Sequence, residues 1–285
     1  MKQLDYLYHF TKDFSNLKAI LHNGFKPSYA KERLADKDVL IPMVSFSNIL
    51  LRDTGADEVI NYGDYALCLN RDWGIANDVN PVIYTYDHGL LYNALKTFLH
   101  NTVILTALRS FKSHLKEFNQ NKVVFSKSIK LTNTSKEVLD ILDYLSMNYN
   151  ERLIEILADH ANTIHDANFP ILTLTKPYKV NKDLKEFDAY NDREWRKVFS
   201  ELMVLFEGGE EYQFWSNLPK PHFHDKKYSL LFSLEDIKAI IVQNEDEIQY
   251  ILNELEALYD TAYIKNRIEN ELLVIGTKAQ LLDII

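Results

Sequence analysis

Apolar and polar residues alternate in four stretches near the start of the chain. Alternation with a period of two is typical of strands that bury one face. The predicted strands are residues 4–10, "VLIPMVSFSNI" (39–49), "YALCLN" (65–70) and "NPVIYTY" (80–86). Pro42 interrupts the second stretch, and proline is tolerated mainly on edge strands or where a strand starts. We therefore expect a β-rich first part, with Pro42 at one of those positions.

Helical spacing interrupts this strand pattern. The stretch "TKDFSNLKAILHNGF" (11–25) predicts a helix with Ser15 as its N-cap and Gly24 at its end. Residues 88–168 change character, because apolar residues recur there at helical intervals, with Ser135 as a suitable cap for the second half. This middle part predicts a mainly helical insertion packed on one side of the sheet.

The strand pattern resumes after the insertion. Strands are predicted within "FPILTLTKPYKV" (169–180), "EWRKVFSELMVLF" (194–206) and "YSLLFSLEDIKAIIV" (228–242), the last as strand, turn and strand. A helix at 244–258, a short strand near 271–277 and a helix from Lys278 follow. The pattern predicts one α+β domain over residues 1–285, with a mostly antiparallel sheet and residues 88–168 inserted into it.

Composition and charge narrow the class of protein. The 285 residues are 46% apolar, which is enough for a sizeable core. A net charge of −9 argues against broad binding to a nucleic-acid backbone, although a local basic groove stays open. The single cysteine, Cys68, excludes an internal disulfide and predicts a buried thiol. Because no signal-peptide core or membrane-spanning run is apparent, we expect a cytoplasmic protein without membrane contact.

The stretch "YNDREWRKVF" (190–199) places acids inside a strand-like run. With a period of two, Asp192, Glu194 and Arg196 share one face of this strand. Two carboxylates and a guanidinium on one face are either a solvated edge or the polar floor of an active site. On a solvated edge their ion pair would contribute only about 0–1 kcal/mol to stability.

Two further strands carry polar residues with more than one interpretation. His9 and Thr11 share a face in "LYHFT", where an isolated histidine is commonly a core residue with one hydrogen-bond partner. Both side chains can donate and accept, so they also suit a sugar hydroxyl. In "SFSN", Ser45 and Ser47 share one face and Phe46 the other. The stretch is either an ordinary strand without a function or one wall of a site. As a wall it would offer a pair of hydroxyls on one face, or an aromatic ring for a flat heterocycle on the other.

Tyrosines and histidines elsewhere have simpler structural explanations beside the functional ones. Tyr62 and Tyr65 flank Gly63, as expected of a turn with core aromatics. His222 and His224 form an "HFH" pair on one side of an extended segment, but the sequence nearby offers no third ligand. We therefore predict no metal site.

Five stretches of the chain resemble, in this order, the bacterial AbiGi family of abortive-infection (phage-resistance) proteins. They are "LYHFTKDFSNLKAILHNGFKPSYA", "IPMVSFSNI", "NYGDYALCLNRDWGIANDVNPVIYTY", "TKPYK" and "YNDREWRKV". The resemblance extends from about residue 6 to residue 285. The family is described as an antitoxin, which implies a partner protein from a toxin–antitoxin or defence operon.

A more distant resemblance, to ADP-ribosyltransferase-like domains of the DarT type, supplies a chemistry. Such domains open with a strand bearing His and a following helix, continue with a strand carrying Ser or Tyr-Phe, and place a catalytic Glu on a later strand. The matching residues here are, in turn, His9 with Thr11, Ser45 with Phe46, and Glu194 with Asp192. No tyrosine stands in "VSFSN", so Tyr62 or Tyr65 would have to supply the stacking ring.

This second resemblance implies a split, mostly antiparallel sheet and NAD as the substrate. NAD would be held by six residues: His9, Thr11, Ser45, Phe46, Tyr62 and Tyr65. Cleavage of the nicotinamide–ribose bond develops oxocarbenium charge, which the Glu194 carboxylate would stabilise. Asp192 would position or deprotonate the acceptor.

The expected function is therefore anti-phage defence by an NAD-dependent ADP-ribosyltransferase. Its acceptor would be a phage or host macromolecule, either protein or nucleic acid. The first alternative is a catalytically silent, antitoxin-like protein that binds and restrains a partner toxin, and such a protein needs an exposed apolar patch. The second is a nucleic-acid-binding module, which the net charge of −9 disfavours. Assembly into a homo-oligomer stays open.

Overall fold

The computed structural model describes residues 5–34, 37–51, 63–99, 151–182, 185–218 and 223–281. Within these residues the fold is α+β, built on a nine-stranded sheet whose main path runs β13-β12-β4-β1-β3-β10-β5, with β2 and β11 also paired to β3. All its neighbours are antiparallel except β12 and β13. The prediction of an α+β fold with a mostly antiparallel sheet is confirmed.

The strands of this sheet come from both halves of the chain. They are β1 (Tyr6–Thr11), β2 (Ser28–Leu34), β3 (Lys37–Ser47), β4 (Tyr65–Asn70), β5 (Asn80–Pro81), β10 (Glu194–Val198), β11 (Leu205–Phe206), β12 (Ile237–Val242) and β13 (Val274–Thr277). Two small sheets lie beside it: β6 (Ile83–Thr85) with β7 (Thr175–Pro177), and β8 (Lys179–Lys182) with β9 (Lys185–Asp188).

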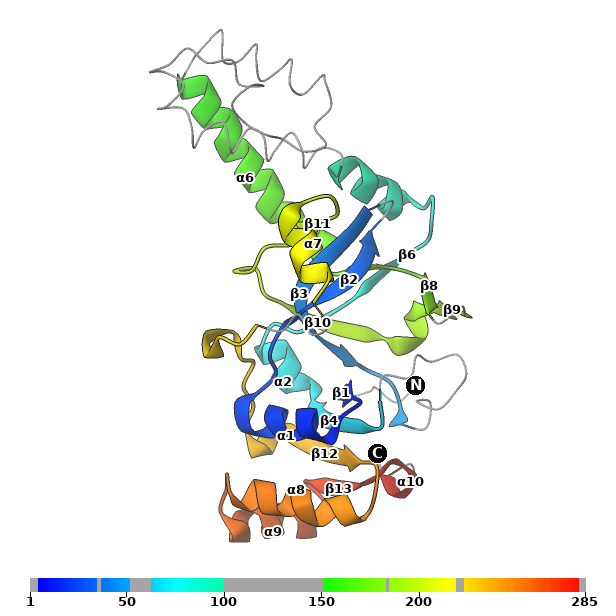
Figure 1. Cartoon of the computed structure of the whole chain (residues 1–285), viewed down its shortest axis with the longest axis vertical. Coiled ribbons are helices and arrows are strands. Elements are labelled where there is room, and N and C mark those ends of the chain that lie inside the picture. The colour runs from blue at the N-terminus through cyan, green and yellow to red at the C-terminus, as the bar shows by residue number, and fades with distance from the viewer. Residues whose placement is uncertain are drawn as a thin grey trace.

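Helices cover the sheet unevenly, as Figure 1 shows. The helices are α1 (Phe14–Asn23), α2 (Arg71–Ala76), α6 (Glu151–Thr173), α7 (Glu210–Ser216), α8 (Asp246–Glu256), α9 (Thr261–Glu269) and α10 (Lys278–Leu281). The helix α6 projects from one end of the molecule, while α8 and α9 lie at the other end beside β12 and β13. Single 3-10 turns occur at η2 (Ala189–Asp192), η3 (Lys226–Tyr228) and η4 (Leu234–Asp236).

The largest core forms where α1, α2, α8 and α9 pack on the strands β1, β4 and β12. Fully buried aliphatic side chains such as Leu7, Leu17, Leu67, Ile240 and Leu255 meet there. Their burial follows from the sequence, because α1 and α8 present apolar residues at helical spacing and the strands at a spacing of two. Cys68 is a buried free thiol, as predicted.

Several expected element boundaries are wrong. The first helix starts at Phe14 with Asp13 as its N-cap, so Ser15 lies inside it. Pro42 is in the middle of β3, which has neighbours on both sides, rather than on an edge or at a strand start. Its carbonyl accepts from the Phe199 N–H beyond the end of β10. Proline lacks the N–H that would face the same way, and the Phe199 carbonyl accepts instead from the Leu202 N–H at 3.0 Å.

Two stretches predicted as strands are not strands. Residues 169–173 form the last turns of α6, where Thr173 Oγ1 donates to the Phe169 carbonyl at 2.9 Å. A short apolar run does not distinguish a buried strand from a helix. Tyr228 ends the 3-10 turn η3, and residues 229–232 contain only an isolated bridge from Leu230 to Phe25. The helix α9 was not predicted at all.

The predicted helical insertion is described only at its ends. Residues 90–99 and the helix α6 are helical, in agreement with the expected spacing. Residues 100–150, including Ser135, lie outside the described part of the chain.

Candidate functional site

The three sequence elements singled out above lie on three neighbouring strands. His9 is on β1, Ser45 and Phe46 on β3, and Glu194 opens β10, with β3 between the other two. The strands β1 and β3 pair at one register position, Tyr8 with Ser47. Beyond it they diverge, and the His9 ring bridges the opening through a 2.8 Å hydrogen bond between Nδ1 and the Ser45 carbonyl. The sheet is therefore open between β1 and β3.

A cavity of about 260 Å³ occupies this opening. Five of the residues to which the sequence assigned NAD binding or catalysis line it: His9, Ser45, Phe46, Asp192 and Glu194. They come from three separate parts of the chain, and strand order alone brings them together. Asp192 belongs to η2, immediately before β10, and both it and Glu194 are largely buried, at 2% and 7% exposed.

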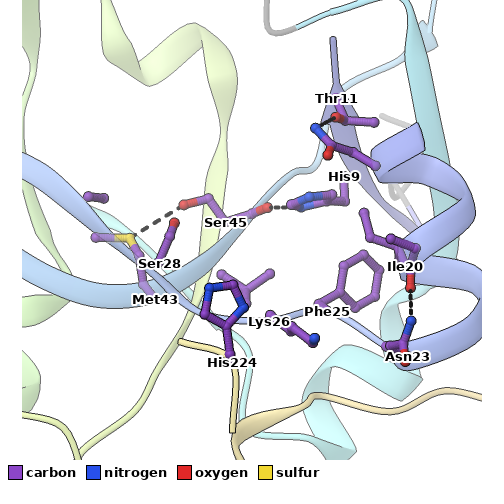
Figure 2. A pocket seen from close by; sticks show the side chains of 15 residues that line it. His9, Thr11, Ile20, Asn23, Phe25, Lys26, Ser28, Met43, Ser45 and His224 are labelled. Atoms are coloured by element: carbon purple, nitrogen blue, oxygen red, sulfur yellow. Dashed lines mark hydrogen bonds between the residues drawn. The ribbon is translucent and has the colours of Figure 1, made fainter. Parts of the chain in front are cut away.

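The other three candidates are placed differently. Thr11 lines a second cavity, of about 370 Å³, together with His9 and Ser45 (Figure 2). Tyr65 lines neither cavity: its hydroxyl donates to Glu247 Oε1 at 2.8 Å, and Gln243 Oε1 lies 3.2 Å from the same hydroxyl. Tyr62 lies outside the described residues. Of the described aromatic candidates, Phe46 thus lies at the first cavity, beside Tyr8 and Phe10, and Tyr65 lies away from it.

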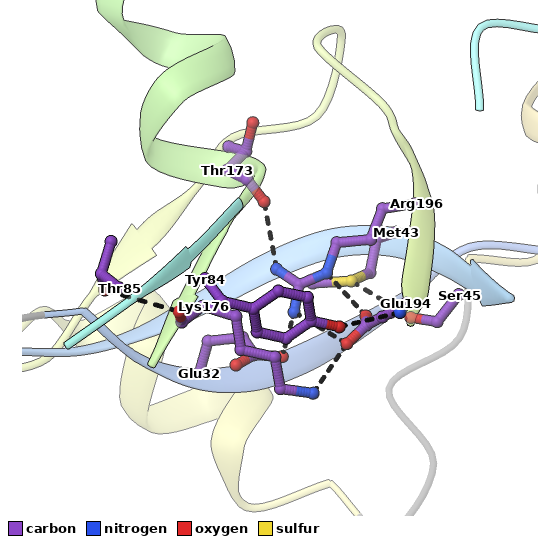
Figure 3. A network of polar contacts seen from close by, with 9 residues as sticks. All are labelled: Glu32, Met43, Ser45, Tyr84, Thr85, Thr173, Lys176, Glu194 and Arg196. Atoms are coloured by element: carbon purple, nitrogen blue, oxygen red, sulfur yellow. Dashed lines mark hydrogen bonds and ion pairs between the residues drawn. The ribbon is translucent and has the colours of Figure 1, made fainter. Parts of the chain in front are cut away.

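Glu194 is part of a buried network of charges, shown in Figure 3. Its Oε1 accepts from Arg196 Nε at 2.6 Å, and its Oε2 accepts from Lys176 Nζ at 2.6 Å and from Arg196 Nη2 at 3.2 Å. Arg196 also donates to Glu32 Oε1 at 2.7 Å and to the Thr173 carbonyl at 3.1 Å. The network therefore ties together β2, β7, β10 and the end of α6.

The charges of the network fix its protonation states. Burial by itself would raise the pKa of Glu194, but the Arg196 and Lys176 charges outweigh burial and lower that pKa from 4.5 to about 2. Burial would lower the pKa of Lys176, but Glu194 and Glu32 raise it instead. Glu194, Lys176 and Arg196 are therefore all ionised at neutral pH.

The remaining acceptor capacity of Glu194 is small. A carboxylate offers about four lone-pair sites, and the network uses three of them. About one lone-pair site therefore remains, on a residue that lines the first cavity and is only 7% exposed. Glu194 can thus offer an ionised, rigidly held carboxylate to a ligand, but as a single contact.

Three members of this environment were given no role from the sequence. Tyr84 Oη accepts from the Glu194 backbone N–H at 2.8 Å, and burial raises the pKa of the Tyr84 hydroxyl. Glu32 lies in "SYAKERL", which was not recognised as a strand. Lys176 was quoted within "TKPYK" without a role, although a lysine inside a strand-like apolar run was a usable signal of a buried partner.

No metal centre is apparent in the described part of the chain, where no three His, Cys, Asp or Glu side chains gather to hold an ion. His224 lines the second cavity, and His222 lies outside the described residues. None of the described helices is long and apolar enough to cross a membrane.

The fold and site together define an α+β protein with a polar cavity in an opening of its sheet. Residues 25–243 match the family described as "Putative abortive phage resistance protein AbiGi, antitoxin". The match covers well over half of the chain, which therefore belongs to the AbiGi family of abortive-infection, phage-resistance proteins. No curated protein and no solved structure matches the chain.

Proposed function

We propose that this AbiGi-family protein acts in phage defence as an NAD-dependent ADP-ribosyltransferase. The observation that carries the proposal is that His9, Ser45, Phe46, Asp192 and Glu194 line one cavity. They come from three distant stretches of the sequence, each of which resembles the corresponding element of such enzymes. The opening between β1 and β3 also supports the split sheet that the resemblance implies.

The proposed reaction breaks the bond between nicotinamide nitrogen and ribose C1′. The bonding electron pair leaves with nicotinamide, and C1′ gains oxocarbenium character. A nucleophile on the acceptor then bonds to C1′ and gives up its proton to a base. Asp192, two residues before Glu194 in the sequence, is the proposed base. Acceptors are phage or host macromolecules.

The cavity wall has the charge that this reaction needs. Glu32, Asp192 and Glu194 all line it, and the one lysine on the same wall, Lys176, is paired with Glu194. Because the Glu194 pKa is about 2, that carboxylate is ionised throughout the physiological range. A fixed anion beside a developing cation stabilises the transition state more than the ground state.

A second candidate function is antitoxin-like restraint of a partner toxin without turnover. It is favoured by the ion pairs of Glu194. Lys176 and Arg196 offset much of the carboxylate charge that would otherwise stabilise an oxocarbenium ion. The family description also contains the word antitoxin. In this function the cavity would have no catalytic role, and the charge network would only stabilise the fold.

Nicotinamide release from NAD distinguishes the two functions. The purified protein should release nicotinamide, and Glu194→Gln should lower the rate about 10²–10³-fold per folded molecule, by analogy with removal of one transition-state stabiliser. NAD affinity should change much less. The matched control is Glu201→Gln, because Glu201 is an exposed glutamate outside both cavities. No release by any of the three proteins would favour the antitoxin-like function, and equal rates of release by all three would exclude Glu194 as the catalytic carboxylate.

A further inference from the structure

Two cavities meet at the opening between β1 and β3. His9, Ala30 and Ser45 line both of them and form their common wall. The first has a volume of about 260 Å³ and the second about 370 Å³. Sites for cofactor-sized ligands usually span about 300–1,000 Å³. A dinucleotide therefore needs more room than the first cavity provides, and the second adjoins it.

The two cavities differ in electrostatic character. Three carboxylates, from Glu32, Asp192 and Glu194, and one ammonium, from Lys176, line the first, so that carboxylates are in excess there. No carboxylate is found among the described residues that line the second, whereas Lys26 and His224 both reach it. A cationic group is thus favoured in the first cavity, and an anionic group in the second.

Lys26 and His224 approach the second cavity from different segments. Lys26 follows α1 and the Gly24 turn, and His224 precedes η3. Figure 2 shows both side chains among those that line the cavity. In the part of the chain that the structure describes, no carboxylate forms an ion pair with either side chain. Phe25 and Ile20 supply an apolar surface in the same cavity. This combination of free cationic or N–H donors with an apolar wall suits a phosphate group attached to a flat ring.

We infer that the two cavities form one extended dinucleotide site, in which Lys26 and His224 bind the diphosphate. The inference rests on the proposed function for the identity of the ligand as NAD. NAD carries a positive nicotinamide ring and a negative diphosphate, and this polarity matches the acidic first cavity and the carboxylate-free second one. His9 and Ser45, on the shared wall, lie where the ligand passes from one cavity to the other.

Binding measured by calorimetry tests this inference without any turnover. ADP-ribose carries the diphosphate, and nicotinamide riboside carries the positive ring without it. Lys26→Gln should weaken ADP-ribose binding about 10–100-fold, as expected for a hydrogen bond to a charged group, and His224→Ala should weaken it as well. Neither change should alter the affinity for nicotinamide riboside by more than about twofold. Lys265→Gln, in the exposed face of α9, is the matched control.

Each outcome is decisive. Equal ADP-ribose affinities for Lys26→Gln and Lys265→Gln would overturn the inference, as would an equal loss of both ligands. ADP-ribose binding that depends on Lys26, in a protein that never releases nicotinamide, would overturn the proposed function alone. Nicotinamide release with ADP-ribose affinity independent of Lys26 would overturn this inference alone. Failure of the wild-type protein to bind ADP-ribose would overturn this inference, and nicotinamide release would then decide the proposed function by itself.

Discussion

Replacing Glu194 with glutamine should remove a pH-dependent part of the stability of the protein. Glu194 is buried, and its pKa falls from 4.5 to about 2 on folding because Arg196 and Lys176 hold its charge. A shift of that size corresponds to about 3 kcal/mol of free energy of unfolding at neutral pH. Loss of one partner from a buried ion pair costs a similar amount, about 3–5 kcal/mol. The two estimates agree, so Glu194→Gln should destabilise the protein by about 3 kcal/mol at pH 7.

The sign of the pH dependence follows from the direction of the shift. Because the folded-state pKa is lower than the unfolded one, the contribution is complete above about pH 4.5 and is lost as the pH falls towards 2. The stability difference between wild type and Glu194→Gln should therefore shrink to about 1 kcal/mol at pH 3. Urea unfolding of both proteins at pH 7 and at pH 3 measures this difference directly.

The control for this measurement is Glu201→Gln, which removes an exposed carboxylate and should change stability by less than about 0.5 kcal/mol at either pH. A difference between wild type and Glu194→Gln that is the same at both pH values would refute the reasoning. So would a loss below 1 kcal/mol at pH 7, because the network would then contribute no more than a surface pair.

Three further changes test other parts of the account. His9→Ala should abolish nicotinamide release while circular dichroism shows a folded protein, and full activity of folded His9→Ala would exclude His9 from the site. Gly63→Ala should lower the melting temperature and cost more than about 1 kcal/mol, because Gly63 has a φ of 135° and a Cβ there would lie 2.2 Å from the Thr11 carbonyl oxygen; an unchanged melting temperature would contradict this. Arg267→Met should cost about 1–3 kcal/mol in urea unfolding, since the buried guanidinium donates to three backbone carbonyls at 3.1–3.4 Å. A neutral Arg267→Met would show that these carbonyls find other donors.

Strands with clear alternation could be predicted from the sequence, and elements whose identity depends on tertiary contacts could not. The strands β1, β3, β4, β10 and β12 follow their patterns closely. Residues 169–173 were misassigned because their short apolar run fits both a strand and a helix, and only their continuity with α6 decides.

The candidate site was predictable as far as which side chains share a face. The alternation predicted a shared strand face for Asp192, Glu194 and Arg196 but left open whether that face is buried. All three are buried, and Asp192 lies in η2 rather than on β10. It could not reveal Lys176 and Glu32, the partners that complete the network, because they come from β7 and β2. The placement of these strands next to one another is a long-range property that a single sequence does not display. It determines how far the Glu194 charge is offset by neighbouring cations, and so how strongly that charge acts on a ligand.

The central claim is that the protein transfers ADP-ribose from NAD to an acceptor, and that the Glu194 carboxylate at the first cavity stabilises the transition state. The most direct measurement is the movement of label from adenine-labelled NAD onto macromolecules of a bacterial extract, prepared with and without phage infection. The account predicts that wild-type protein labels an acceptor, and that folded Glu194→Gln labels it about 10²–10³-fold more slowly. Absence of any transferred label with wild-type protein that binds NAD, or equal labelling by the two proteins, would contradict it.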